Sequence, residues 1–254
     1  MNNTGPTAGE SRKANMGDIC KYIILFQGRA GSTYLTEHMR HHGQIRAMFE
    51  EFTTIPGDWD SQLDWMSNFF YSKSHGDAIR AVGFKTKYTD IADLDLFTNF
   101  VQDNGIKVIH LFRRNLVKLI ISVIRADELR RLHGDSNLYQ AKKELGKIKV
   151  SPKEFRRHKK RIRHYKELRD FVDNLNVDIC KVSYEQLLHN LDGSLKKIWR
   201  FLGVENQATQ AEVMKNTPDR LEDAVENLDE LKATFPEYER FFSESFDSAT
   251  QSNV

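Results

Sequence analysis

The chain has 254 residues, of which 39% are hydrophobic and 29% are charged. Its formal net charge is only +2, so the composition does not suggest a general binder of nucleic acids or of membrane surfaces. A chain of this length buries one sizeable core, and nothing in it requires a second domain.

The two ends of the chain are predicted to be tails around one domain. Residues 1–18 are polar, contain glycine and proline, and lack the apolar centre of a signal peptide. We therefore expect a disordered tail over 1–18, a folded domain over 19–247 and a second disordered tail over 248–254. No apolar stretch approaches the length of a membrane span. Cys20 and Cys180 are too few for a disulfide framework and lack metal-ligand spacing, so we expect two buried free thiols in a cytoplasmic protein.

Short apolar runs alternate with segments of helical periodicity along most of the chain. In chain order we expect strand 19–27, helix 32–42, strand 45–49, helix 58–71, strand 80–86, helix 91–103, strand 106–113, helix 116–131, a long helix from 151, strand 178–184 and a helix around 195–202. The polar segment 133–150 has no predicted structure. This alternation predicts a single α/β domain with a central parallel sheet flanked by helices, a three-layer arrangement like that of P-loop NTPases. Ligands of such sheets bind beyond the carboxyl ends of the strands.

A glycine-bearing turn follows the first predicted strand, with the sequence Gln-Gly-Arg-Ala-Gly-Ser-Thr-Tyr-Leu at 27–35. Backbone N–H groups and a helix N-terminus converge at such a junction and can form an anion site. Arg29 adds a forked cationic donor, and Ser32 and Thr33 add hydroxyl donors. Taken alone, the turn fits an ordinary strand–turn–helix connection about as well.

A P-loop for ATP or GTP, G-x-x-x-x-G-K-[ST], is the obvious alternative for this turn. Gly28 and Gly31 lie too close together for that motif, and no lysine precedes Ser32. A nucleotide kinase also needs an acidic residue that helps to hold magnesium. The strand 106–113 ends in arginine instead, which suits a phosphate rather than a metal ion.

A second candidate anion site follows the strand that ends at 113. Arg114 stands at the strand end, and Ser122 lies eight residues later, about two helical turns further on. If the helix runs back over the strand end, both side chains can converge on one anion. Taken singly, Arg114 also fits a solvated strand end, and Ser122 fits a serine that packs between helices.

The two motifs together resemble those of sulfotransferases that use the donor 3′-phosphoadenosine-5′-phosphosulfate (PAPS). The segment 28–35 is similar to the 5′-phosphosulfate loop of that family. Arg114-Asn115 followed by Ser122 is similar to its 3′-phosphate motif, R-N/D-x(6)-S. The order of the two motifs and their strand–loop–helix setting agree with the family as well.

Two further segments carry a weaker resemblance. The segment 182–187, Val-Ser-Tyr-Glu-Gln-Leu, resembles a family segment whose tyrosine lies near the adenine, and 216–231 resembles the tail of some bacterial members. The resemblance covers most of residues 21–235 and looks closest to bacterial carbohydrate or glycolipid sulfotransferases.

This resemblance implies donor-binding roles for particular residues. Those that would hold the 5′ end of the donor are consecutive: Arg29, Ala30, Gly31, Ser32, Thr33 and Tyr34. Arg114 and Ser122 would hold the 3′-phosphate, and Tyr184 is a weaker candidate for the adenine. Many members carry lysine where this chain has Arg29, and arginine can stabilise charge on the leaving phosphate but cannot give a proton away. Part of that role is therefore expected of Lys85, with Lys87 as its alternate, although either also fits a solvated lysine.

The resemblance also implies a glutamate base soon after the first loop. In the segment 47–52, Ala-Met-Phe-Glu-Glu-Phe, Glu51 fits that spacing best and Glu50 comes next. Aromatic neighbours would raise the pKa of such a carboxylate toward a useful value, although a pair of exposed loop carboxylates is the competing interpretation. His110 lies inside a predicted buried strand, and we expect it to be a packed core histidine.

Opposite charges gather in two late segments of the chain. The predicted helix 153–169 has nine Lys or Arg against two Glu, which fits a solvated helix face or a basic lid over an anionic donor or acceptor. The segment 219–247 has ten Asp or Glu against three Lys or Arg, so it is a candidate to neutralise that helix by contact.

The sequence therefore predicts a sulfotransferase that transfers sulfonate from PAPS to an acceptor hydroxyl, releases PAP and requires no metal. Positioning and electrostatics would supply most of the rate. A carbohydrate, a glycolipid or another small alcohol is the expected acceptor, with a protein tyrosine also open, and no nucleic-acid partner is expected. Neither the acceptor's identity nor the oligomeric state can be read from the sequence. Two alternatives stand: a nucleotide-dependent kinase with a degenerate P-loop, and a non-catalytic nucleotide-binding module of the same fold.

Overall fold

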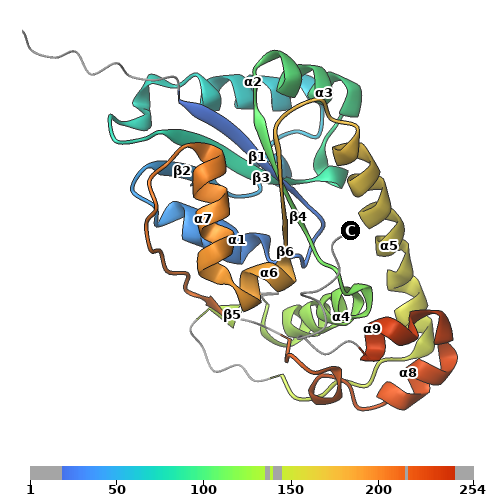
Figure 1. The fold of residues 1–254 in the computed structure, drawn as a ribbon. Helices are drawn as coiled ribbons and strands as arrows, with labels where there is room; N and C mark the ends of the chain where they lie inside the picture. The colour runs from blue at the N-terminus through green and yellow to red at the C-terminus, as the bar shows by residue number, and fades with distance from the viewer. Residues whose placement is uncertain (1–18, 135–137, 140–144, 215–216, 244–254) are drawn as a thin grey trace, which may run out of the picture.

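A parallel sheet between two layers of helices forms the centre of the molecule (Figure 1). The computed structural model describes residues 19–134, 138–139, 145–214 and 217–243. The sheet consists of β1 (Cys20–Phe26), β2 (Ile45–Met48), β3 (Ala81–Lys87), β4 (Lys107–Phe112) and β6 (Ile179–Ser183). Their spatial order is β2-β3-β1-β4-β6, and every neighbouring pair is parallel. The predicted single α/β domain with a central parallel sheet is confirmed.

Helices cover both faces of this sheet. The longer ones are α1 (Ser32–Arg40), α2 (Trp59–Phe70), α3 (Leu94–Asp103), α4 (Leu116–His133), α5 (Pro152–Asp173) and α7 (Leu191–Leu202). Shorter ones are α6 (Tyr184–His189), α8 (Leu228–Thr234) and α9 (Glu239–Ser243), together with the 3₁₀ turns η1 (Glu51–Thr53), η2 (Lys73–His75), η3 (Tyr88–Asp90), η4 (Leu221–Asp223) and η5 (Pro236–Tyr238). Two residues each of β5 (Leu138–Tyr139) and β7 (Val213–Met214) form a small antiparallel ribbon.

The central strand β1 is apolar along nearly its whole length because helices bury both of its faces. Tyr22, Ile24 and Phe26 pack into a cluster with side chains of α1, α6 and α7. Ile23 and Leu25 point the other way, into a cluster with side chains of α2, α3 and α5. All five side chains are at most 1% exposed, which is the pattern expected for a parallel strand covered on both sides.

A third hydrophobic cluster joins α4 and the first half of α5 to the C-terminal segment, residues 221–242. Phe155 of α5 is fully buried there, with its ring centroid 4.5 Å from that of Phe235. Lys159 of the same helix forms an ion pair with Glu237 at 2.9 Å. The basic helix and the acidic segment are therefore in contact, through apolar side chains as well as through this ion pair.

Two local features differ from the sequence-based expectation. Tyr184 begins helix α6 instead of ending a strand over 178–184, because Ser183 caps that helix in a reciprocal capping box with Gln186. The segment 133–150, for which no structure was predicted, contains the short strand β5 and a parallel bridge between Ile148 and Val225. The predicted tails over 1–18 and 248–254 lie outside the described residues.

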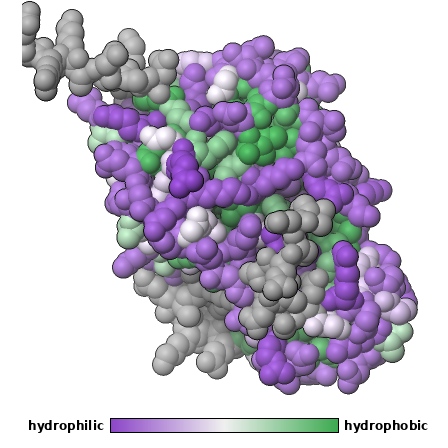
Figure 2. Space-filling view, viewed as in Figure 1, coloured by the Kyte–Doolittle hydropathy of each residue, from purple (hydrophilic) through white to green (hydrophobic). Residues whose placement is uncertain are grey.

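The surface and the cysteines add little further constraint on function. The face seen in Figure 2 is mostly hydrophilic, with smaller hydrophobic areas between the polar side chains. Cys20 and Cys180 are free thiols, as predicted, but only Cys180 is buried and Cys20 is partly exposed. Among the described helices, none combines the length and the apolar character that crossing a membrane requires.

Candidate active site

Candidate residues from five distant parts of the sequence lie at the same edge of the sheet. Because all five strands are parallel, their carboxyl ends lie at the same edge, where ligands of such sheets bind. Each strand brings one candidate to this edge: Arg29 after β1, Glu50 after β2, Lys85 near the end of β3, Arg114 after β4 and Tyr184 after β6.

The segment between β1 and α1, residues 27–33, is called the anion loop below. Two of its residues have positive φ: Arg29 at 72° and Gly31 at 83°. A side chain at Gly31 would overlap the ring of Tyr184, so both the backbone angle and the close approach require glycine here. Helix α1 begins at Ser32 with no side-chain cap, which leaves its first N–H groups facing the loop. Positive φ at a non-glycine residue beside a free helix N-terminus is typical of an anion-binding loop.

Lys85 is hydrogen-bonded to the anion loop. Its ammonium donates to Thr33 Oγ1 at 3.0 Å and to Ser32 Oγ at 3.5 Å, and it forms an ion pair with Glu50 at 3.2 Å. The residue is only 1% exposed, so it is not a solvated strand-end lysine. Burial lowers its pKa, and the attraction of Glu50 opposes that shift.

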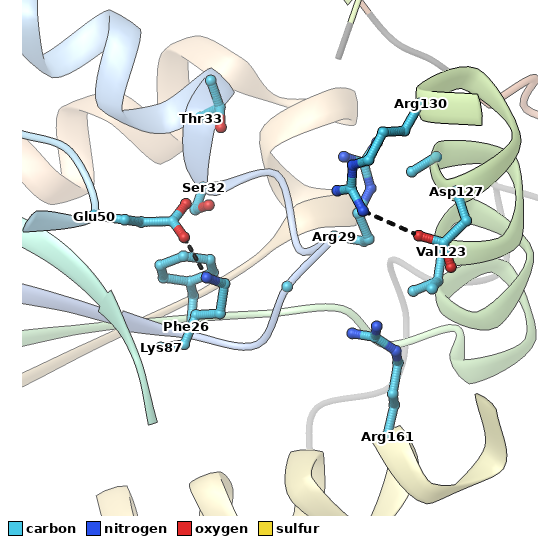
Figure 3. A pocket seen from close by; sticks show the side chains of 12 residues that line it. Phe26, Arg29, Ser32, Thr33, Glu50, Lys87, Val123, Asp127, Arg130 and Arg161 are labelled. Carbon is cyan, nitrogen blue, oxygen red and sulfur yellow. Dashed lines mark ion pairs between the residues drawn. The ribbon is translucent and has the colours of Figure 1, made fainter. Parts of the chain in front are cut away.

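Glu50 and Glu51 have different surroundings. Glu50 forms ion pairs with both Lys85 and Lys87, and Figure 3 shows the pair with Lys87. Burial by itself raises the pKa of Glu50, but Lys85 and Lys87 outweigh it and leave the pKa below its ordinary value. The prediction of a raised pKa is therefore wrong for Glu50, because the attraction of two nearby ammonium groups exceeds the effect of burial. Glu51 begins the 3₁₀ turn η1 instead.

Arg29 links the two predicted anion motifs. Its Nε donates to Ser122 Oγ of α4 at 3.3 Å. Arg113, which is 4% exposed, donates to the carbonyl oxygen of Arg29 at 3.3 Å and lies over the ring of Tyr184 at 4.8 Å. Burial, followed by repulsion from Arg113, lowers the pKa of Arg29. Two guanidinium groups with little solvent around them make this part of the loop strongly electropositive.

The segment that carries Arg114 is held in place through its main chain. The Glu185 carboxylate accepts the backbone N–H of Arg114 at 3.0 Å and that of Asn115 at 3.2 Å. Asn115 caps α4 by accepting the Lys118 N–H at 2.8 Å. Ser122 accepts a hydrogen bond from Arg29. Binding of one phosphate by both Arg114 and Ser122 stays a prediction.

Tyr184, the weaker candidate for the adenine, lies against the anion loop. Its ring contacts the Gly31 position and lies beneath the Arg113 guanidinium. These contacts make it a support of the anion loop, and its predicted position near an adenine stays a prediction.

A cavity of about 290 Å³ opens beside the anion loop (Figure 3). Its walls come from the end of β1 and the loop, from the segment after β2, from the end of β3, and from α4 and α5. The charged residues that line it are Arg29, Lys87, Arg130 and Arg161 on the positive side, and Glu50 and Asp127 on the negative side. Glu50 is part of this lining and Glu51 is not, and the role of either as a base stays a prediction. An excess of cations in a concave site suits an anionic ligand.

Comparison with known proteins adds three solved structures. No family model and no curated protein matches the sequence. A crystal structure from Alicyclobacillus acidocaldarius matches at 17% identity over 92% of this chain and 97% of its own, with a TM-score of 0.48. A domain from the curacin biosynthetic pathway matches at 13% identity over 74% of this chain and 76% of its own, with a TM-score of 0.46. A protein from Mycobacterium avium matches at 12% identity over 90% of this chain and 78% of its own, with a TM-score of 0.43. All three are sulfotransferases. Because these similarities are low, the functional argument below rests on the site of this chain alone.

Several residues of the site were not singled out by sequence reasoning. Glu185 belongs to a segment of weak resemblance, and nothing in the sequence shows that it caps the start of α4. Arg130 lies eight residues after Ser122, a helical spacing that could have indicated the same face of α4. Arg161 is one of nine basic residues in its helix, and no spacing distinguishes it from the others.

His110 takes no part in the site. It lies on β4 with 2% exposure, and neither ring nitrogen has a hydrogen-bond partner among the described residues. Burial lowers the pKa of His110 to about 4, with a smaller contribution from Lys181. It is a neutral core histidine, as predicted.

The described residues also contain no group of three or more His, Cys, Asp or Glu placed to hold a metal ion.

Proposed function

We propose that this protein is a sulfotransferase that moves a sulfonate group from PAPS to an acceptor hydroxyl and releases PAP. The observation that carries the proposal is the contact between Arg29 of the anion loop and Ser122 of α4. It joins the two segments that, by resemblance, would bind the 5′ and 3′ ends of this donor. A nucleotide with phosphate groups at both ends needs two anion sites that lie close together.

In this proposal the anion loop holds the phosphosulfate. The N–H groups at the start of α1, with the hydroxyls of Ser32 and Thr33, bind its oxygens, and Arg29 stabilises charge on the departing phosphate. Lys85 lies on Thr33 and has a lowered pKa, so it can donate a proton or a strong hydrogen bond to the leaving oxygen. Lys85 therefore takes the part that Arg29 cannot perform.

Glu50 is the base in this proposal. As the acceptor oxygen bonds to sulfur, the sulfur–oxygen bond to the 5′-phosphate breaks, its electron pair stays on PAP, and Glu50 takes the acceptor proton. Lys85 is shared between Glu50 and the loop. A bound phosphosulfate would draw Lys85 toward itself, weaken its hold on Glu50 and raise the pKa of that carboxylate.

The two alternatives receive less support. A kinase would carry an acidic metal ligand near the end of the sheet, whereas β4 is followed by Arg113 and Arg114. A non-catalytic module would have no need for a carboxylate and an ammonium group paired at the loop. We propose a carbohydrate or another small alcohol as acceptor, and transfer without a metal ion.

Calorimetric titration with PAP tests the donor assignment. We expect PAP to bind in the presence of a chelator, and to bind more tightly than AMP, which lacks the 3′-phosphate. Arg114→Ala should weaken PAP binding about 10- to 100-fold and AMP binding much less, because only PAP loses a charge-assisted hydrogen bond. If PAP fails to bind and ATP with magnesium binds, the kinase alternative replaces this proposal. PAP binding without transfer from PAPS to any alcohol would indicate the non-catalytic module.

A further inference from the structure

The cavity has a second cationic wall that the donor motifs do not account for. Helix α4 lines it with Val123, Ala126, Asp127 and Arg130, which follow one another at helical spacing on a single face. Arg161 reaches into the same cavity from α5 (Figure 3). Neither arginine belongs to the anion loop or to the predicted 3′-phosphate motif.

Arg161 bridges the space between α5 and the anion loop. Its Nη1 lies 4.0 Å from the point where a Cβ at Gly28 would stand. Its Nε is buried and has no hydrogen-bond partner among the described residues. A buried N–H without an acceptor is costly, so a turn of the guanidinium that brings Nε to an anion in the cavity would be favoured.

Among the described residues of this wall, Asp127 is the single carboxylate that accompanies Arg130 and Arg161. Asp127 forms an ion pair with Arg130 at 3.6 Å and lies 3.9 Å from His158 Nε2. The side chain of Arg130 is 62% exposed, so it can turn toward a ligand at small cost. Two planar guanidinium groups beside one carboxylate leave a positive charge in excess, in a geometry that suits carboxylate, sulfate or phosphate.

We propose that Arg130 and Arg161 form an anion subsite for the acceptor, so that the physiological acceptor carries a carboxylate, sulfate or phosphate group near its reactive hydroxyl. The inference rests on the proposed function, since it assigns the loop side of the cavity to the donor. Glu50 lines the same cavity. An acceptor whose anion is held between α4 and α5 therefore has its remaining hydroxyls in the space that also contains the base.

Two probes with the same hydroxyls and different charge test this subsite: 4-nitrophenyl β-D-glucuronide and 4-nitrophenyl β-D-glucoside. Each is titrated into PAP-saturated protein, so that no turnover is required. We expect the glucuronide to bind about tenfold or more tightly than the glucoside, the effect of one charge-assisted contact. Arg161→Gln and the double variant R130Q/R161Q should abolish that preference and change PAP affinity less than about twofold.

Arg163→Gln is the matched control. Arg163 lies on the same helix, its side chain is 75% exposed, and it pairs with Glu167 outside the cavity lining. This variant removes the same charge and should keep the preference for the glucuronide.

Each other outcome overturns a definite statement. Equal binding of both probes, or no binding of the glucuronide to the wild-type protein, contradicts the acceptor subsite. Loss of PAP affinity in Arg161→Gln, without unfolding by circular dichroism, would assign these arginines to the donor and overturn the inference. Failure of the wild-type protein to bind PAP would instead contradict the proposed function.

Discussion

Glu50 and Glu51 show at the residue scale how one position in the chain changes the chemistry of a carboxylate. Glu50 contacts Lys85 and Lys87 and lines the cavity, whereas Glu51 begins a 3₁₀ turn. Spacing along the sequence favoured Glu51, because spacing counts residues and carries no information on which side chain faces the loop. The pairing of β2 with β3 makes that choice, because it brings Glu50 to Lys85 and Lys87.

We predict that Glu50→Gln lowers the rate of sulfonate transfer about 10²- to 10⁴-fold, the usual contribution of a general base. The amide keeps the shape of the side chain, so PAP affinity should change little. Glu51→Gln is the matched control and should change the rate less than about twofold. The measurement is the initial rate of PAP release from PAPS in the presence of an accepted alcohol. If Glu51→Gln is instead the slow variant, the base is Glu51.

His110 makes the stability of the fold depend on pH. Its folded-state pKa is about 4, whereas a histidine in an unfolded chain titrates near its ordinary value of 6.5. Between these values the unfolded chain binds a proton that the folded protein does not, so the free energy of unfolding falls as the pH falls. The loss from this residue amounts to about 3 kcal/mol by about pH 4.

His110→Leu should remove that part of the pH dependence, because leucine fills the apolar site and does not titrate. The measurement is urea unfolding of both proteins at about pH 7 and about pH 4.5. The wild-type protein is expected to lose more stability than the variant across that interval. Equal losses would show that His110 becomes protonated within the folded protein at no cost.

At the scale of elements, helix α6 holds the start of helix α4. Glu185, in the first turn of α6, accepts the backbone N–H groups of Arg114 and Asn115. A carboxylate at a helix N-terminus interacts favourably with the helix dipole and satisfies N–H groups that would otherwise lack partners. The predicted 3′-phosphate arginine is therefore positioned by an element that follows it by about 70 residues.

We predict that Glu185→Ala lowers the free energy of unfolding by about 2 kcal/mol, because it leaves buried N–H groups unsatisfied. PAP binding should weaken as well, since Arg114 loses its anchor. Urea unfolding and calorimetry measure the two effects. Glu222→Ala, which removes an exposed carboxylate, should change neither by more than about 0.5 kcal/mol. Unchanged PAP affinity in Glu185→Ala would mean that the cap stabilises the fold without positioning Arg114.

At the scale of the whole molecule, the C-terminal segment 221–242 forms part of the same folded unit as the sheet. Its apolar side chains pack on α4 and α5, and Phe241 accepts a hydrogen bond from Asn115 Nδ2 at 2.8 Å through its carbonyl oxygen. The segment thus contacts the residue that follows the predicted phosphate arginine. Packing at the C-terminus and geometry at the site are coupled through this contact.

Phe155→Ala should lower the free energy of unfolding by about 3–5 kcal/mol, the usual effect of removing a fully buried aromatic side chain. Urea unfolding, followed by tryptophan fluorescence and by circular dichroism, measures it. Leu96→Ala is the control, because Leu96 is 43% exposed and its loss should cost less than about 1 kcal/mol. If Phe155→Ala produces a separate early transition, the C-terminal segment unfolds independently of the sheet.

Most of the fold was predictable from local patterns. The five strands of the sheet and the six longer helices coincide with predicted runs to within a few residues. The short helices α6, α8 and α9 were missed, because their stability comes from caps and from packing on α4 and α5 rather than from a long periodic stretch. Strand identity and helix period are local properties, and so the sequence alone indicates them well.

The sequence by itself determined a parallel α/β domain, the glycine-bearing loop after the first strand, and the placement of Arg114 and Ser122 after the fourth. Its short runs of apolar and glycine-bearing residues specify local backbone geometry, and that geometry is enough to form these features. The tertiary structure alone decided that Arg29 meets Ser122, that Glu50 rather than Glu51 faces the loop, and that Arg161 enters the cavity. These contacts depend on the spatial order β2-β3-β1-β4-β6 and on the side of the sheet that each helix covers. Long-range packing sets both, and no short window of sequence contains it.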